Sequence, residues 1–213
     1  MSETDKVLPA RIQTALDLVY KLHGMDARKK TSIPYLTHLL SVCAIVQQDG
    51  GGEDEAIAAL LHDALEDKSE QINAEEIEQL FNNRVAEIVL VSSDVPRDFR
   101  GGPKPPWKER KLAYLQHAST LTDPSLLRVT LADKVDNLRA ILIDHEYIGG
   151  DVWKRFNASK GQILWYYTQC YKAYRDAGYD QGKLMKKLKK LIKKFEKISS
   201  LKDRTEAKIS YKV

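Results

Sequence analysis

The chain has 213 residues, 43% of them hydrophobic, which is enough for one substantial domain, or one domain with an appendage, around a sizeable core. It has no run of about 18 apolar residues, and Met1 to Lys6 are polar and acidic, so we expect neither a membrane span nor a signal peptide. The net charge of +4 is uneven. Residues 183–213 hold twelve Lys and Arg against three acids, a net of +9, which leaves −5 for residues 1–182. The basic character therefore belongs to the C-terminal tail.

The two cysteines, Cys43 and Cys170, fit neither a metal-binding nor a disulfide framework. Each stands among apolar or aromatic neighbours in the sequence. We interpret them as reduced core residues of a cytoplasmic protein, since disulfides are rare in that compartment.

The first third of the chain predicts three helices. Apolar residues recur at helical spacing over Ile12–Leu22, and a second helix is expected over Leu36–Gln48. Between them lies a basic loop, residues 26–35. After the glycines at 50–52, a third helix is expected over Glu53–Glu66.

Further helices are expected throughout the rest of the body. Asn73 is expected to cap a helix over Ala74–Phe81, because Glu76 stands at the capping-box position. Other helices are expected over Val85–Val91, Lys108–His117, from Pro124 onward, and over Ile163–Tyr174, and a surface loop of possible function over Ser92–Trp107. No strand pattern or internal repeat is present, so the fold class predicted is all-α.

The C-terminal tail predicts an amphipathic helix. Its apolar stripe consists of Leu184, Leu188, Leu191, Phe195 and Ile198, and seven lysines occupy the opposite face. We therefore divide the chain into a body, 1–182, and a lysine-rich helix and tail, 183–213. Docking on the body, self-association into a homo-oligomer, weak nucleic-acid contact and a membrane-surface helix all remain open for this segment. Nucleic-acid binding is not expected for the acidic body.

The stretch from Ala58 to Asp67 places four polar side chains behind residues that ought to be buried. On a helix, Glu66 lies one turn after His62. Asp67 lies one turn after Asp63, so the four side chains share a broad face. Burying unpaired negative charge costs several kcal/mol per ion, which a divalent cation would offset. The alternative is a solvated acidic helix end.

Two further residues extend this set. His38 lies in an apolar helix and, taken alone, is typical of a hydrogen-bonded core histidine. Asp133 lies in the apolar run Val129 to Ala132 and, taken alone, could pair with Arg128 or Lys134. Together with His62 and Asp63 they supply two imidazoles and two carboxylates. That ligand set suits a borderline-to-hard divalent ion such as manganese, with one metal ion expected.

The order H…HD…D on helices resembles the HD phosphohydrolase superfamily, and three short motifs resemble the hydrolase domain of the RelA/SpoT family. These motifs are Ile33-Pro34-Tyr35-Leu36-Thr37-His38, His62-Asp63-Ala64-Leu65-Glu66-Asp67 and Leu131-Ala132-Asp133-Lys134-Val135-Asp136-Asn137. The resemblance covers roughly residues 10–178, and the length is similar to that of the small alarmone hydrolases. Only about 35 residues follow Gly178, so we expect no synthetase or regulatory domain after the hydrolase domain.

The resemblance implies a compact HD-domain helical bundle that hydrolyses the alarmone (p)ppGpp at its 3′-pyrophosphate with Mn²⁺. It implies that His38, His62, Asp63 and Asp133 hold the metal. It also implies that Glu66 and Asp67 orient and activate the attacking water, that Arg28 and Lys29 lie beside the guanine, and that Asn137 contacts the ribose.

The sequence leaves open which residues make the remaining contacts with the substrate. A polyanionic substrate needs cations near the acidic helix, and the loop and the helix after it offer Lys104 and Lys108. Tyr166 belongs to an aromatic cluster that could form core or a stacking wall for a base. Two other functions remain as alternatives: a metal-dependent phosphatase for another nucleotide such as NADPH, and a non-catalytic nucleotide-binding or partner protein.

Overall fold

The computed structural model describes residues 10–179 and 182–209. Within these ranges every regular element is a helix, and the paired extended backbone is limited to one isolated antiparallel bridge between Ala27 and Pro34. The predicted all-α fold class is confirmed. No helix in the described ranges is long and apolar enough to cross a membrane. The chain divides into two compact units, residues 1–102 and 103–213, which we call unit 1 and unit 2.

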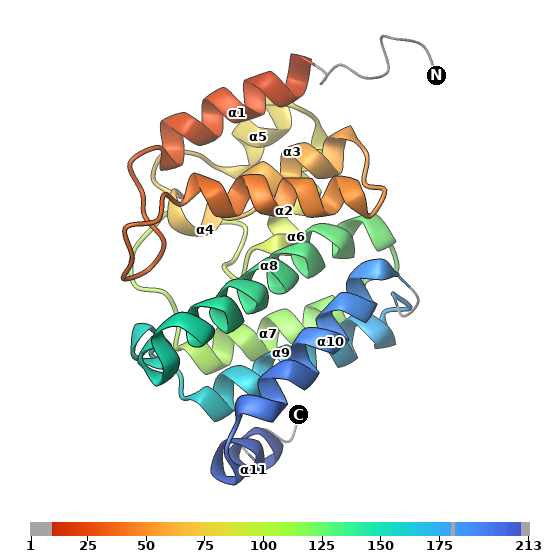
Figure 1. The fold of residues 1–213 in the computed structure, drawn as a ribbon. Helices are drawn as coiled ribbons and strands as arrows, with labels where there is room; N and C mark the ends of the chain where they lie inside the picture. Colours follow the sequence, from red (N-terminus) through yellow and green to blue (C-terminus); the bar gives the residue numbers. More distant parts are fainter. Residues whose placement is uncertain (1–9, 180–181, 210–213) are drawn as a thin grey trace. The chain divides into compact units, whose positions relative to one another are not determined.

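Unit 1 is built around helix α3, Glu53–Leu61, which contacts three other helices of the unit (Figure 1). The six residues Ala56–Leu61 are all buried, as their apolar character on every side of the helix predicts. The other helices of the unit are α1 (Ala10–His23), α2 (Leu36–Gln48), α4 (Ala64–Asp67), α5 (Ala74–Leu80) and α6 (Asn83–Ser92). The capping box of α5 is present, with reciprocal bonds between Asn73 and Glu76 of 3.0 and 2.9 Å.

The sequence pattern predicted that the third helix would continue to Glu66, but it does not. Helix α3 ends at Leu61, His62 and Asp63 form a turn, and α4 begins at Ala64. The Nδ1 atom of His62 lies 2.8 Å from the carbonyl oxygen of Ala59, an acceptor that a continuing helix would use for its own backbone. The side chain competes with the helix, so His62 and Asp63 project from a turn.

Unit 2 is organised along α8 (Pro124–Ile148), which contacts α9 (Lys160–Asp176), α10 (Lys183–Ile198) and the short 3₁₀-helix η2 (Gly149–Arg155). Helix α7 (Trp107–Ala118) and helix α11 (Leu201–Ile209) both pack on α9 (Figure 1). The close approach of α11 requires a glycine, because a Cβ atom at Gly161 would lie 2.8 Å from the carbonyl oxygen of Asp203.

The C-terminal helix packs within unit 2, as in the docked alternative that the sequence left open. Leu184, Leu188 and Phe195 of α10 are buried, and the helix contacts both α8 and α9. The physical reason is the stripe itself, since burying each large apolar side chain contributes about 1.5–3 kcal/mol. The division into a metal-dependent hydrolase domain, 1–182, and a lysine-rich helix and tail, 183–213, stays a prediction.

Candidate functional site

Unit 1 brings three of the predicted metal ligands together. His38 comes from α2, and His62 and Asp63 come from the turn between α3 and α4. A carboxylate oxygen of Asp63 lies 3.0 Å from Nε2 of His62 and 3.9 Å from Nε2 of His38. Both imidazoles are buried, with 2% or less of each residue exposed, and their ring centroids are 5.2 Å apart. Two imidazole nitrogens and one carboxylate oxygen thus converge.

The hydrogen bonding of His62 indicates what this cluster can hold. A carbonyl oxygen only accepts, so the contact of Nδ1 with the carbonyl of Ala59 places a proton on Nδ1. In the neutral imidazole, Nε2 then carries a lone pair that points at the carboxylate of Asp63. Two acceptors 3.0 Å apart repel unless a proton or a metal cation lies between them. A divalent cation bound by nitrogen and oxygen fits this donor set.

Tyr35 is a member of the cluster that the sequence reasoning did not assign to the site. Its hydroxyl donates a short hydrogen bond to the same Asp63 oxygen that faces the imidazoles. Its ring lies 5.6 Å from the ring of His38, which follows it by about one helical turn. That spacing was the available signal, but the contact with Asp63 spans 28 positions in the chain. Tyr35 therefore fixes the orientation of a ligand.

A second layer of polar groups supports Tyr35. His23 is buried, its ring lies 5.4 Å from that of Tyr35, and its Nδ1 lies 2.9 Å from Asp26. Asp26 also accepts from the ammonium of Lys68 at 3.0 Å. Burial alone would raise the pKa of Asp26, but the bonds from Lys68 and His23 outweigh it and lower that pKa below its usual value.

The predicted catalytic pair lies on α4, directly after the turn that carries the ligands. The backbone N–H groups of Glu66 and Asp67 both donate to the carbonyl of Asp63, at 3.2 and 2.9 Å. Glu66 is half-buried and Asp67 is exposed. Because the turn breaks the helix before them, their position relative to the ligands follows from α4 and not from one continuous helical face.

The predicted guanine contacts, Arg28 and Lys29, lie in the loop before α2. The loop folds back on itself, with the N–H of Arg28 donating to the carbonyl of Ile33 at 2.8 Å, beside the bridge between Ala27 and Pro34. Arg28 is half-buried and Lys29 is exposed. Lys30 has a positive φ of 54°, which marks the tip of the turn.

In unit 2, the predicted ligand Asp133 lies on α8 with both carboxylate oxygens hydrogen-bonded. Lys134 donates to one oxygen at 2.6 Å, and the amide of Asn137, one turn later, donates a short bond to the other. Lys134 is buried, which by itself lowers the pKa of its ammonium, yet the negative charge of Asp133 outweighs this and raises that pKa well above its usual value. The pairing with Lys134 that the sequence left open is present.

Tyr166 on α9 is surrounded by cations of the same unit. The ammonium of Lys111 lies 5.1 Å from the centre of its ring, and that of Lys134 lies 6.0 Å away. Its hydroxyl is buried. Tyr166 and its neighbours Trp165, Tyr167 and Tyr174 are all buried, so most of the aromatic cluster is core.

The two lysines proposed as phosphate contacts lie near the start of unit 2. Lys104 is half-buried in the loop before α7, and Lys108 is exposed in the first turn of α7. In unit 1, Arg97 and Arg100 of the preceding loop both pair with Glu75, at 3.2 and 3.5 Å.

Comparison with known proteins gives the family. The HD domain matches residues 15–160. Over 133 residues the chain is 37% identical to the guanosine-3′,5′-bis(diphosphate) 3′-pyrophosphohydrolase MESH1 of Xenopus tropicalis, covering 61% of this chain and 69% of the relative. It is 31% identical over 135 residues to the guanosine-3′,5′-bis(diphosphate) 3′-pyrophosphohydrolase of Aquifex aeolicus, covering 63% of this chain but 18% of that much longer relative.

Two solved structures share the fold. One, described as a metazoan ortholog of SpoT that hydrolyzes ppGpp and plays a role in starvation responses, has a TM-score of 0.69 and 23% identity, over 89% of this chain and 97% of that one. The other is lmo0812 from Listeria monocytogenes, with a TM-score of 0.64 and 24% identity, over 75% and 99%. At these identities the similarity concerns the fold alone. With the HD domain matched over residues 15–160, the chain belongs to the HD-domain family.

Proposed function

We propose that this chain is a metal-dependent hydrolase that cleaves (p)ppGpp at its 3′-pyrophosphate. In this reaction water supplies a hydroxyl group to the departing pyrophosphate and a proton to the ribose 3′-oxygen, leaving GDP from ppGpp or GTP from pppGpp. The observation that carries the proposal is the cluster of His38, His62 and Asp63, in which an imidazole lone pair faces a carboxylate. The relatives named above, whose printed activity is this hydrolysis, support the choice of substrate.

The ion that we assign to this cluster is a single Mn²⁺. His38 and His62 would hold it through imidazole nitrogens and Asp63 through a carboxylate oxygen. We assign Asp133 as the fourth ligand from its place in the Leu131-Ala132-Asp133 motif. A bound divalent ion lowers the pKa of water and neutralises phosphate charge. Tyr35 keeps the Asp63 carboxylate turned toward the imidazoles.

The proton transfers are assigned to the acidic pair of α4. Glu66 accepts a proton from the attacking water, and Asp67 orients that water. Glu66 is half-buried whereas Asp67 is exposed, which supports Glu66 as the base.

The substrate contacts are assigned by charge and shape. Arg28 and Lys29 lie beside the guanine, Lys104 and Lys108 bind phosphate oxygens, and Asn137 contacts the ribose. We assign Tyr166 to the nucleotide because two lysines lie over its ring. A substrate with several negative charges needs these cations beside an acidic helix.

The compartment we propose is the cytoplasm. Cys43, which is half-buried and not in the core as predicted, and Cys170, which is buried, are both free thiols, and burial raises the pKa of each to about 11. Thiols kept protonated in this way are poor nucleophiles. Free thiols fit a reducing compartment, because disulfides form mainly in oxidising ones.

Product analysis tests the function directly. Protein stripped of metal and then supplied with Mn²⁺ is offered ppGpp, pppGpp and NADPH in parallel. We expect pyrophosphate together with GDP or GTP, and no turnover before the metal is restored. Inorganic phosphate released from NADPH alone would assign the site to a nucleotide phosphatase. Binding of ppGpp without turnover would assign it to a nucleotide-binding protein.

A further inference from the structure

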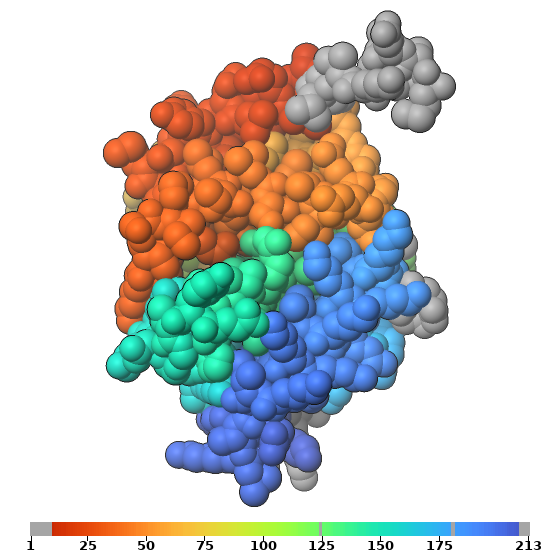
Figure 2. All heavy atoms as spheres, in the orientation of Figure 1, coloured from red at the N-terminus to blue at the C-terminus, as the bar shows by residue number. Residues whose placement is uncertain are grey.

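Helix α10 presents a row of lysines that the proposed hydrolysis does not use. Every exposed residue of this helix is charged, and all but Glu196 are lysines. We call seven of them the lysine face: Lys186, Lys187, Lys189, Lys190, Lys193, Lys194 and Lys197. Figure 2 shows the α10 segment, in blue, at the surface of the molecule.

The lysine face stays turned to solvent because the opposite side of the helix is occupied. Leu188 and Phe195 are fully buried, and Phe195 stacks on the Trp153 ring at 5.2 Å. At the edges of the face, Lys194 pairs with Glu146 and the Lys189 ammonium lies 5.9 Å from the Tyr171 ring. The helix therefore cannot rotate to bury its lysines.

The central lysines of the face have no charge partner of their own. Within residues 10–179 and 182–209, Lys186, Lys190, Lys193 and Lys197 form no ion pair. Holding like charges this close together on one helix is unfavourable by a few tenths of a kcal/mol per pair. An anionic partner would remove this repulsion.

A membrane surface does not fit the geometry. An amphipathic helix binds a bilayer by inserting its apolar side among the acyl chains. In α10 that side is packed on α8 and α9. A protein partner fits poorly as well, since lysine is depleted in protein interfaces and this face offers no apolar anchor.

The phosphate backbone of nucleic acid fits a row of solvent-facing lysines on a helix whose apolar side is already buried. Contacts from lysine to phosphate supply most of the non-specific affinity for nucleic acid. At 16 residues, α10 is about 24 Å long, so its lysines can reach several consecutive phosphates. The face holds no aromatic residue on which an unpaired base could stack, which favours a double helix over a single strand.

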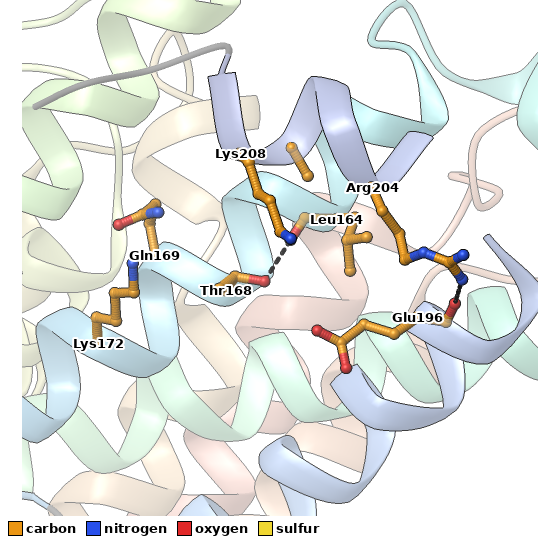
Figure 3. A pocket seen from close by; sticks show the side chains of 8 residues that line it. Leu164, Thr168, Gln169, Lys172, Glu196, Arg204 and Lys208 are labelled. Atoms are coloured by element: carbon orange, nitrogen blue, oxygen red, sulfur yellow. Dashed lines mark hydrogen bonds between the residues drawn. The ribbon is translucent and has the colours of Figure 1, made fainter. Parts of the chain in front are cut away.

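A basic groove beside α10 extends the same chemistry. This cavity of about 460 Å³ is lined by residues of α9, α10 and α11, among them Lys172, Arg204 and Lys208 with a single acid, Glu196 (Figure 3). Arg204 donates to the carbonyls of Glu196 and Ser199, at 3.2 and 2.9 Å, and so ties α11 to the end of α10. The groove adds cations where the lysine face ends.

We propose that the lysine face of α10 is a binding surface for double-helical nucleic acid, contacted through its phosphates without sequence preference. The body of the chain carries −5, so it adds no net attraction for phosphates to that of this helix and its flank. The surface is independent of the hydrolytic site and does not rest on the function proposed for it.

Fluorescence anisotropy with labelled RNA and DNA duplexes of about 20 base pairs, over about 50 to 200 mM salt, tests the proposal. The variant replaces Lys186, Lys190 and Lys193 by Gln. The control replaces Lys21, Lys154 and Arg175, all exposed and off this helix, by Gln, which changes the net charge by the same amount. Circular dichroism confirms that both variants are folded.

For the unchanged chain we expect a Kd of about 10⁻⁴–10⁻⁶ M at physiological salt, equal for unrelated sequences. The α10 variant should bind at least about tenfold more weakly and lose about 3 from the slope of log K against log salt, because each phosphate contact contributes about 0.9. The control variant should keep both the affinity and the salt dependence of the unchanged chain. Equal losses in both variants, or no binding to any duplex, would overturn the proposal. Binding to phosphatidylserine vesicles without binding to duplexes would assign the face to a membrane.

Discussion

At the scale of single residues, the cluster in unit 1 works because each side chain is held by another. Nδ1 of His62 is bound to a backbone carbonyl, and the Asp63 carboxylate receives the hydroxyl of Tyr35. Such outer contacts fix the tautomer and the orientation of metal ligands.

Replacing Asp63 by Ala should abolish Mn²⁺ binding and turnover together. The change removes the anionic oxygen that faces both imidazoles, which leaves the two neutral imidazoles and the assigned fourth ligand, Asp133. Metal content after dialysis and release of pyrophosphate are measured on the same sample. Asp17→Ala, an exposed carboxylate of α1, is the control. Turnover retained by Asp63→Ala would remove the metal assignment.

Replacing Tyr35 by Phe should weaken Mn²⁺ affinity or turnover by about 10- to 100-fold, the usual size of an outer-contact effect. The ring remains beside His38, so only the hydrogen bond to Asp63 is lost. Titration of metal into the stripped protein measures the affinity. Tyr20→Phe, at a position that is 69% exposed, should change nothing. An unchanged affinity and rate would mean that Asp63 is oriented without its hydroxyl partner.

Replacing Glu66 by Gln should keep the metal and lower kcat by about 10²–10⁴, the usual contribution of a general base. The amide has the same shape but cannot accept the proton. Single-turnover kinetics and metal analysis are the measurements, with the exposed Glu70→Gln as control. Loss of the metal in Glu66→Gln would make this residue a ligand and would refute its role as a base.

Among the elements, one helix differs from its sequence pattern and another settles an alternative that the pattern left open. Helix α3 stops before the ligands, where His62 takes a backbone acceptor, and α10 docks by its apolar stripe on α8 and α9. Neither outcome could be predicted from the local sequence alone. The end of α3 sets the direction in which the ligands project, and the packing of α10 decides what the C-terminal helix contributes to stability.

Replacing Phe195 by Ala should lower the free energy of unfolding by about 3–5 kcal/mol, because the ring is fully buried and leaves a cavity. Urea titration followed by circular dichroism measures the change. The control, Leu201→Ala, removes a side chain that is 74% exposed and should cost little. A small effect of Phe195→Ala would show that α10 is only loosely held and could act as an appendage.

At the scale of the whole molecule, each compact unit contains one free cysteine, Cys43 in unit 1 and Cys170 in unit 2. Burial raises the pKa of both thiols to about 11, so few thiolates exist in the folded chain at neutral pH. Since each unit has a core of its own, the two thiols can report on the opening of the two units separately.

Both thiols should react slowly with iodoacetamide at pH 8 in the native protein and quickly in denaturant. In Phe195→Ala, labelling of Cys170 should accelerate more than labelling of Cys43, because the cavity lies in the same unit as Cys170. Mass spectrometry of the labelled peptides gives both rates. Equal acceleration would mean that the two units open together, and fast native labelling would contradict the burial of the thiols.

The all-α class, most helix boundaries and the resemblance to HD-domain proteins could be predicted from the sequence. Apolar periodicity and capping residues are local properties, so Asn73 could be recognised as a cap and Leu184 to Phe195 as a stripe. The pairs His62-Asp63 and Glu66-Asp67 could also be recognised from the sequence, because acidic residues that directly follow an apolar helical segment form a local pattern.

Only the tertiary structure decided which side chains hold these groups in place. Tyr35 reaches Asp63 across 28 positions and Lys68 reaches Asp26 across 42, and no periodic pattern encodes such contacts. The docking of α10 likewise depends on surfaces of α8 and α9 that form only when those helices pack. Long-range contacts are set by the packing of apolar faces, and the sequence alone specifies the faces but not their partners.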